Sequence, residues 1–332
     1  MTAETKPDIT PVRWQPPRSR PLPPPDLNRR LRIVFVGAPG PEDVVVDSDG
    51  ALWTGAADGK IIRIDGDTGT TTEVADTGGR PLGLAVARDG HLLVCDSHRG
   101  LLRMDRATGE LETLVSEVDG RTLTFCSNVV ESSDGTIYFT ESSNKFRFEH
   151  YKGAMIETSG GGSLFRRDLD GTVTTLATGL YFANGVTLTA DESALVFAET
   201  LGARISKYWL TGSQAGTITP LADELPGYPD NISTGPDGRI WVAMVADRNA
   251  VVERLAPKAP ALRKLMWRLP YGWLPDAKPM VWVIAFDPDD GRVLTQLRQR
   301  HPAFGASTGV VQHGDRVWVG GIGSPTVAYF DL

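Results

Sequence analysis

A short β-type unit repeats along most of this chain, and the repeat constrains the fold more than any other feature. Each unit reads as a strand, an Asp-Gly-type turn and a second strand, followed by two further strands, as in residues 44–54, 60–65 and 70–74. Asp-Gly between β-type runs is a strong hairpin signal. A four-stranded unit recurring about every 40–45 residues is typical of a propeller blade. Six units follow one another, so the sequence predicts an all-β, six-bladed β-propeller.

The N-terminal part has a different composition from the repeats. Residues 1–30 are polar and Pro-rich, and they are interpreted as an extended, poorly packed arm rather than a domain. Residues 31–332 are assigned to the propeller. The β-type run 31–36 is expected to pair with the last blade and close the ring, because closure removes a free sheet edge.

Two insertions interrupt the period, at 142–162 in the third blade and at 251–280 in the fifth. The first is polar and Gly-rich. The second has Leu262, Leu265 and Leu269 at helical spacing, which predicts a short helix over 261–269. That helix either forms a lid over the ring or packs against the flank of its blade.

Charge and hydropathy exclude several kinds of partner. The chain has 332 residues, a net charge of −7 and no Lys/Arg block, which argues against a nucleic-acid groove. No apolar stretch approaches the roughly 20 residues of a membrane span, and the N-terminus lacks an apolar signal core. We therefore expect a cytoplasmic protein with no membrane partner. Cys95 and Cys126 lie in apolar runs and are expected to be buried free thiols, although a disulfide between them stays open. The sequence gives no oligomeric state.

Oxygen-bearing side chains recur at one position of the predicted blades. Glu42, Asn128, Asn184 and Asp230 each precede or open an innermost strand, and Asn231 follows Asp230 directly. Innermost strands line the channel of a propeller, so these side chains are expected to meet at one mouth. A single Asn is ordinarily a turn residue, but the recurrence favours a shared site. Oxygen donors without a His or Cys cluster suit calcium better than zinc or copper. The sequence therefore predicts one calcium ion.

Six motifs in fixed order resemble the strictosidine-synthase-like family, from about residue 31 to the C-terminus. They are Gly40-Pro-Glu-Asp43, Gly79-Arg-Pro-Leu-Gly83, Cys95-Asp-Ser-His-Arg-Gly-Leu101, Tyr138-Phe-Thr-Glu-Ser-Ser143, Gly179-Leu-Tyr-Phe-Ala-Asn-Gly185 and Leu225-Pro-Gly-Tyr-Pro-Asp-Asn231. The family is related to paraoxonases and gluconolactonases. The resemblance implies a six-bladed propeller and calcium-dependent hydrolysis of lactones or aryl esters. It places the paraoxonase calcium ligands on Glu42, Asn128, Asn184, Asp230 and Asn231, and the gluconolactonase ligands on Glu42, Asn184 and Asp230.

Three departures from these families narrow the expectation. The stretch 306–311 lacks the glutamate that strictosidine synthase uses, which disfavours an amine–aldehyde condensation. Leu82 and Asp96 occupy the places of the paraoxonase His pair, so that base is missing. Val129 replaces an Asp of the second, structural calcium, so a second ion is not expected even though Asp43 remains.

For hydrolysis, the ion would offset charge growing on the carbonyl oxygen, and a carboxylate base would still be needed. Asp230 is the first candidate for ligand and proton acceptor, with Asp96 and Glu141 as second choices. His98 is either a proton donor or an exposed loop residue. Aromatic side chains beside the ligands are expected either to wall an apolar pocket or only to pack: Phe125, Phe182 and Tyr228. A calcium-stabilised binding propeller without catalysis stays open as the other function.

Overall fold

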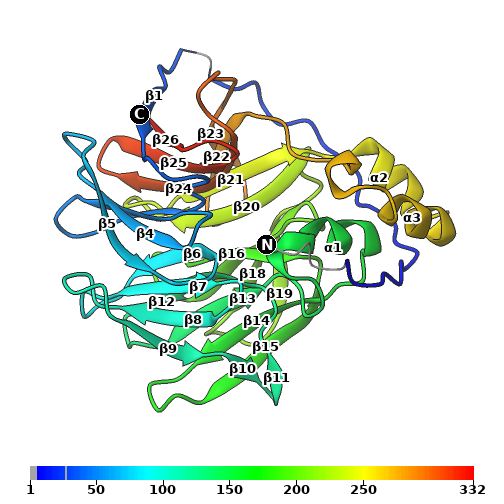
Figure 1. The fold of residues 1–332 in the computed structure, drawn as a ribbon, viewed down its shortest axis with the longest axis horizontal. Helices are drawn as coiled ribbons and strands as arrows, with labels where there is room; N and C mark the ends of the chain where they lie inside the picture. Colours follow the sequence, from blue (N-terminus) through cyan, green and yellow to red (C-terminus); the bar gives the residue numbers. More distant parts are fainter. Residues whose placement is uncertain (1–5, 27) are drawn as a thin grey trace.

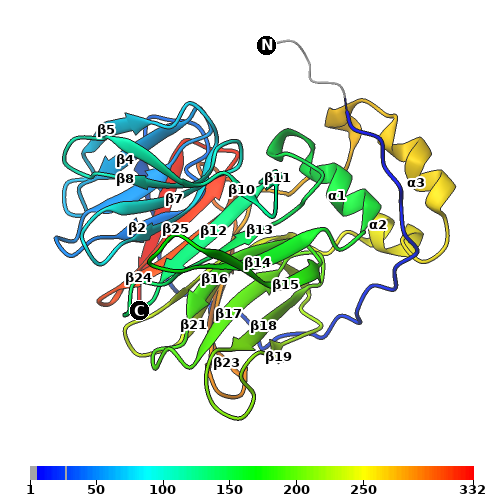
Figure 2. The ribbon, with the colours of Figure 1, turned by 90° about the horizontal axis from the view of Figure 1, so that it is seen from below.

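The computed structural model describes residues 6–26 and 28–332, and its strands form six four-stranded antiparallel sheets around a central channel (Figures 1 and 2). This confirms the predicted six-bladed β-propeller. In five of these sheets the four strands follow one another in sequence, whereas the sixth combines the last three strands of the chain with the first. The first strand of each run lines the channel.

Blades 1 to 3 hold the N-terminal half. Blade 1 contains β2 (Val44–Val46), β3 (Leu52–Gly55), β4 (Lys60–Ile64) and β5 (Thr71–Asp76). Blade 2 contains β6 (Pro81–Val86), β7 (Leu92–Asp96), β8 (Gly100–Met104) and β9 (Leu111–Val115). A small hairpin, β10 (Glu117–Val118) and β11 (Arg121–Thr122), leads to blade 3, which contains β12 (Cys126–Glu131), β13 (Ile137–Glu141), β14 (Gly162–Arg167) and β15 (Val173–Leu180).

Blades 4 to 6 complete the ring. Blade 4 contains β16 (Ala183–Leu188), β17 (Ala194–Glu199), β18 (Arg204–Trp209) and β19 (Ile218–Ala222). Blade 5 contains β20 (Gly227–Thr234), β21 (Ile240–Asp247), β22 (Val281–Phe286) and β23 (Val293–Gln299). Blade 6 contains β24 (Ala306–His313), β25 (Arg316–Ile322), β26 (Thr326–Asp331) and, as its outermost strand, β1 (Arg32–Phe35).

Strand β1 closes the ring, as the sequence predicts. It pairs antiparallel with β26 over four residues, with Val34 opposite Val327. One blade therefore combines the two ends of the propeller, and β1 covers the outer edge of β26.

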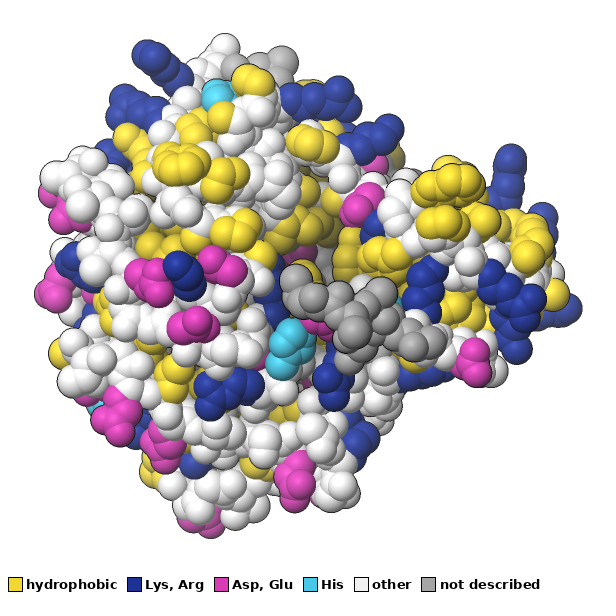
Figure 3. Space-filling model, in the orientation of Figure 1, with side chains coloured by type: hydrophobic (Ala, Val, Ile, Leu, Met, Phe, Trp, Pro, Cys, Tyr) yellow, Lys and Arg dark blue, Asp and Glu magenta, His cyan; other side chains and the backbone are white. Residues whose placement is uncertain are grey.

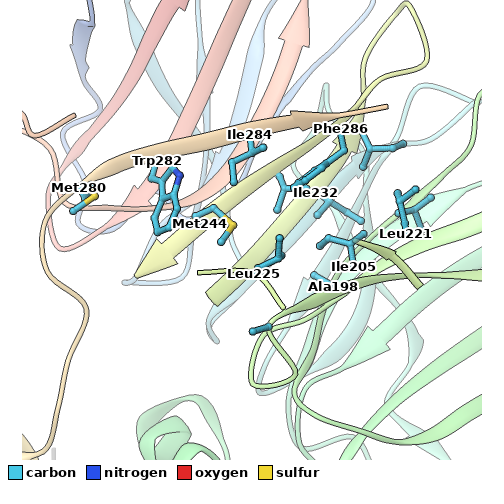
Figure 4. Packing of buried hydrophobic residues seen from close by; sticks show 14 residues of the cluster. Ala198, Ile205, Leu221, Leu225, Ile232, Met244, Met280, Trp282, Ile284 and Phe286 are labelled. Atoms are coloured by element: carbon cyan, nitrogen blue, oxygen red, sulfur yellow. The ribbon is translucent and has the colours of Figure 1, made fainter. Parts of the chain in front are cut away.

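Apolar layers between neighbouring blades hold the ring together. Between blades 4 and 5, for example, Ala198 and Ile205 face Met244, Trp282 and Phe286, and all five side chains are buried (Figure 4). Each such layer removes apolar surface from water on both sheets, at about 25 cal/mol per Å². The blades are thus fixed to one another, which lets side chains from different blades form one site.

The two insertions form a helical layer beside the channel mouth. The first contains η1 (Phe148–His150) and α1 (Tyr151–Glu157), and the second contains α2 (Ala250–Leu255), α3 (Pro260–Trp267) and η2 (Tyr271–Trp273). We call residues 148–157 and 250–278 the cap. The predicted helix over 261–269 corresponds to α3, whereas α1 and α2 were not predicted.

The N-terminal arm is extended, and part of it packs along the cap. Figure 2 shows it passing between α1 and α3. The Val12 N–H donates to Glu157 O at 3.0 Å, the Trp14 N–H donates to Ala256 O at 3.2 Å, and Ile9 is buried. Most of the other described residues of the arm are exposed or half-buried, so the expected extended arm is present, and what the sequence did not show is its docking along the cap.

Two further expectations concern membranes and thiols. Within the described residues, no helix combines the length and apolar content needed to cross a bilayer. Cys95 on β7 and Cys126 on β12 are buried free thiols, as expected, and their sulfur atoms lie 3.0 Å apart between blades 2 and 3.

Candidate metal centre and substrate pocket

The innermost strands of five blades have an irregular register close to the channel mouth. The shifts lie between Pro81 and Leu84, Cys126 and Val129, Ala183 and Val186, Pro229 and Ile232, and Ser307 and Gly309. At a β-bulge, two residues oppose one, which bends the strand and redirects its side chains. Each bulge brackets the residues that the sequence singled out or their counterparts in neighbouring blades, so this local irregularity aims them into the channel.

Two successive levels of side chains result. The upper level lines an apolar pocket under the cap and consists of Glu42, Ser127, Asn184, Asp230 and Thr308. The lower level is made by the residue that follows in each strand. Among these residues, Asp43 and Asn128 line a separate cavity of about 260 Å³ on the other side, together with valines of the innermost strands.

The lower level contains a hydrogen-bonded bridge across the channel, formed by Asp43, Asn128 and Asn231. The Asn128 amide nitrogen donates to Asp43 Oδ2 at 3.3 Å and to Asn231 Oδ1 at 3.0 Å. The Asn128 Oδ1 accepts from the Val186 N–H at 3.0 Å, which fixes the orientation of that amide. The structure therefore gives Asn128 and Asn231 a role in the bridge, one level below the predicted metal site.

Glycines from the alternate blades make room for this bridge. A Cβ atom would lie 2.5 Å from the Asn128 Cα at Gly83, 2.6 Å from the Asn231 Cα at Gly185, and 2.7 Å from the Asp43 Cα at Gly309. Distances this short are forbidden for a real side chain. Around the ring, a bridge residue thus alternates with a glycine, and only three side chains fit at this level.

The upper level brings Glu42, Asn184 and Asp230 together from three blades. The Asn184 amide nitrogen donates to Asp230 Oδ1 and, at 3.2 Å, to Thr200 Oγ1, while its Oδ1 accepts from Ser127 Oγ at 3.0 Å. These three predicted ligands are all buried. The side chain of Asn184 is therefore held in place from two sides next to a carboxylate.

Arg80 occupies the other side of Glu42. Its Nη2 donates to Glu42 Oε2 at 2.5 Å, its guanidinium lies 4.7 Å from the centre of the Phe148 ring, and its Nε has no partner among the described residues. Both side chains of this ion pair are nearly fully buried. Arg80 fixes one oxygen of Glu42 and leaves the other free to face the pocket.

The buried carboxyl groups are electrostatically unfavourable as anions. Burial, opposed by Arg80, raises the pKa of Glu42. Burial and, next, the charge of Glu42 raise the pKa of Asp230 well above its usual value, with a further contribution from Asp43. Burial also raises the pKa of Asp43 to about 7. Three acids thus share one region with Arg80 as their close cation, and a second cation would offset the remaining negative charge.

The upper level fits a hard cation by its chemistry. Glu42, Asn184 and Asp230 offer oxygen donors, and three protein ligands leave coordination positions for water or substrate, since calcium takes six to eight oxygens. Asn184 would present its oxygen after rotation of its amide, whose two ends are nearly the same size. Among the described residues, no three His, Cys, Asp or Glu side chains form a metal-binding group, because the third donor here is an amide.

The pocket above these donors has a volume of about 110 Å³ and an apolar wall. Phe125 and Phe182 pack edge to face with ring centres 5.4 Å apart, and Tyr228 completes the wall from blade 5. All three aromatic residues singled out from the sequence therefore line the pocket. Phe148 and Tyr151 of the cap line it as well and were not predicted.

Three other predicted residues lie outside the pocket lining. Glu141 is fully buried and receives two hydrogen bonds from Arg121, at 2.9 and 2.5 Å. Asp96 Oδ1 accepts from the backbone N–H groups of His98 and Arg99, and the His98 ring lies 2.6 Å from Glu149 Oε1. Asp96 and Glu141 are thus tied to local structure, and their positions give no support to a role as proton acceptor.

Sequence reasoning missed Ser127, Thr308 and Arg80. The alternation of bridge residues and glycines could have identified Ser127. Asn128 occupies the same position in its blade as Asp43 and Asn231, so the residue before it, Ser127, lies level with Glu42. Arg80 belongs to the motif Gly79-Arg-Pro-Leu-Gly83, which contributed only to the family resemblance. A buried arginine beside a glutamate cannot be recognised from a Gly-Arg-Pro string alone.

Fold and site together define a class: a six-bladed propeller with an oxygen-donor centre at the channel mouth beneath an apolar pocket. The family model described as SMP-30/gluconolactonase/LRE-like region matches residues 41–270. This chain belongs to that family.

Comparisons with individual proteins agree with this assignment. The strictosidine synthase-like protein 6 of Arabidopsis thaliana is 32% identical over 93% of this chain and 85% of its own length, in line with the resemblance seen in the motifs. A gluconolactonase structure from Xanthomonas campestris covers 99% of both chains with a TM-score of 0.68 at 19% identity. The calcium-binding protein regucalcin of Agrobacterium tumefaciens covers 88% of this chain and 89% of its own, with a TM-score of 0.61 at 17% identity. The two structures support the fold.

Proposed function

We propose that this protein is a calcium-dependent hydrolase of lactones or aryl esters. The observation that carries the proposal is the meeting of Glu42, Asn184 and Asp230, from blades 1, 4 and 5, at the floor of an apolar pocket. A family that includes gluconolactonases and a neighbour described as calcium-binding supports a lactonase-type activity.

The residues of the site have separate roles in this proposed reaction. Glu42, Asn184 and Asp230 would hold the ion, which when bound would polarise a carbonyl oxygen. Arg80 fixes the orientation of Glu42. Asp230 is the carboxylate at the floor of the pocket that would accept a proton from the attacking water.

The aromatic wall positions the substrate. Phe125, Phe182 and Tyr228 contact the apolar part of an ester or lactone and exclude bulk water from the floor. Exclusion of water strengthens the electrostatic interactions of the carboxylates with whatever they bind. A pocket of this size and polarity favours compact, uncharged substrates.

The experiment measures hydrolysis of a panel of lactones and aryl esters after chelation and after calcium is added back. We expect turnover only with calcium, and we expect Asp230→Asn to lower kcat/KM by about 10²–10⁴-fold. Asp237→Asn is the matched control, since this exposed residue of the same blade pairs only with Arg239 among the described residues and should retain activity.

Other outcomes identify the competing functions. Tight calcium binding by calorimetry without turnover of any panel member would favour the calcium-stabilised binding propeller. Product from an amine and an aldehyde, with no ester hydrolysis, would contradict the proposal in favour of a condensing enzyme. The predicted cytoplasmic location and the absence of a nucleic-acid partner stay predictions.

A further inference from the structure

The helix α3 presents its apolar side chains to solvent and its cation to the interior. Arg263 is fully buried and Trp267 is 5% exposed, whereas Leu262, Leu265 and Leu269 are 47%, 58% and 40% exposed. At 100° per residue Leu262 and Leu265 lie on one outward side of α3, and the exposed Leu269 follows directly after the C-cap residue of the helix. A surface helix of a globular protein ordinarily has the opposite orientation, with its apolar stripe facing the core.

Neighbouring elements of the cap add further exposed apolar side chains. Val251 of α2 and Trp273 of η2 are 57% and 76% exposed, and Figure 3 shows hydrophobic side chains gathered over α2 and α3 beside dark blue basic ones. We call Val251, Leu262, Leu265, Leu269 and Trp273 the cap face. Half of the ten large hydrophobic residues that are exposed in the described chain lie in this short segment. Such a concentration indicates an interaction surface rather than scattered exposure.

The same segment carries an opposite charge to the rest of the protein. Residues 250–278 contain six Lys or Arg and two Asp or Glu, in a chain of net charge −7. Arg254, Lys258, Lys264 and Arg268 are exposed, and no ion pair within residues 6–26 and 28–332 involves them. These cations therefore border the cap face without local compensation.

The described part of the arm does not cover the cap face. Arg263 donates to Val12 O, the Trp267 Nε1–H donates to Pro7 O at 2.8 Å, and the Lys6 ammonium lies 4.7 Å from the centre of the Trp267 ring. These contacts involve the buried side of α3, toward α1 (Figure 2). The Lys6 ammonium also donates to Trp267 O at 2.9 Å and to Leu269 O, so the arm reaches the backbone at Leu269, while the side chains of Leu262, Leu265 and Leu269 stay exposed.

We propose that the cap face docks on an anionic lipid surface, contrary to the expectation from sequence that the protein has no membrane partner. Outward leucines and a tryptophan beside basic side chains match the apolar boundary and the negative headgroups of such a surface. The leucines project from a helix and do not line a groove, which suits a soft planar surface better than a folded partner. Pro275, Asp276 and Ala277 of the cap also line the pocket, so docking would bring the pocket close to lipid-dissolved molecules.

The test is flotation of the full-length protein with two kinds of vesicle, phosphatidylcholine alone and phosphatidylcholine with about 30% phosphatidylserine. We expect binding to the anionic vesicles that weakens with added salt. The triple change Leu262→Ser, Leu265→Ser and Leu269→Ser and the double change Lys264→Glu and Arg268→Glu should each weaken it by about tenfold or more.

Matched controls lie outside the cap. Leu169→Ser with Leu294→Ser and Arg88→Glu with Arg300→Glu alter exposed residues of the same types and should bind like the parent protein. Equal thermal unfolding midpoints would show that all variants are folded.

Absence of vesicle binding at low salt would overturn the proposal, and so would equal binding by the cap and control variants. A dimer that the triple change dissociates, without vesicle binding by the parent protein, would assign the cap face to a second copy of this chain instead. Because the measurement is binding, its outcome is independent of whether the pocket hydrolyses esters.

Discussion

At the scale of single residues, the site is a balance between three buried acids and the cations near them. Glu42 has Arg80 as its partner, whereas the partners of Asp230 and Asp43 in residues 6–26 and 28–332 are amides and backbone N–H groups. An anion without a countercharge in a buried place costs free energy unless it becomes protonated or binds a cation. At neutral pH, the upper level is therefore expected to be more stable with a bound cation than without one.

This balance predicts a pH dependence. The pKa of Asp43 is raised to about 7 in the folded state, and that of Asp230 is raised as well. A carboxyl with a raised folded-state pKa contributes stability below its unfolded pKa near 4, and loses it as the pH rises through the folded value. Without calcium, the free energy of unfolding should fall between about pH 4 and pH 7, by up to roughly 4 kcal/mol for Asp43 alone.

Thermal unfolding with a chelator and with calcium, from pH 5 to pH 8, measures this effect. The stabilisation by calcium should grow with pH, and Asp43→Asn should flatten the curve obtained with chelator. A midpoint with chelator that stays constant or rises across this window would contradict the electrostatic account.

At the scale of elements, one buried arginine fastens the cap to the arm. Arg263 Nη1 donates to Ile156 O at 2.9 Å and to Thr158 Oγ1 at 3.0 Å, and its Nη2 donates to Val12 O. It thus joins α3, the end of α1 and the arm. Since α1 has seven residues and α2 has six, neither is long enough to be stable by itself, and both depend on such contacts.

Replacing this residue should release the arm and loosen the cap. Arg263→Met leaves backbone oxygens without donors and should lower the free energy of unfolding by roughly 3 kcal/mol. Limited proteolysis should then cleave within residues 6–26 faster than in the parent protein. Arg268→Met, on the exposed side of the same helix, is the control, and equal cleavage of the two variants would argue against this role.

The dependence on tertiary contacts also explains what could be predicted. The blades could be predicted from the sequence because Asp-Gly turns and β-type runs are local signals. The helix α3 could be predicted from the spacing of its leucines. The helix α1 could not be predicted in this way, since it contains Gly153, whose missing side chain makes room for Phe146. The level of Asn128 was missed for a related reason: a bulge moves a side chain by one residue, and no local pattern marks where the bulge falls.

At the scale of the whole molecule, the ring depends on a strand from its own beginning. β1 pairs with β26 along Arg32–Phe35, and the sequence predicted this closure. The chain can therefore be shortened in two steps with different consequences. Loss of residues 2–30 removes the arm alone, whereas loss of residues 2–36 also exposes the edge of β26.

We expect the first truncation to remain a monodisperse propeller with a loosened cap. The second should unfold at a temperature about 10 °C or more lower and should form larger species, because an uncovered strand edge pairs with other chains. Size-exclusion chromatography and thermal unfolding of the two truncated proteins make the comparison. Equal behaviour of both would show that β1 is dispensable for closure.

The bridge of Asp43, Asn128 and Asn231 gives the channel a dead end. These side chains separate the pocket from the cavity on the other side, so among the described residues a molecule in the pocket has no way through the channel and exchanges past the cap. Whatever forms in the pocket has to leave through the opening by which its precursor came in. Substrate and product then pass through the same opening, and a molecule that blocks it stops substrate entry and product release together.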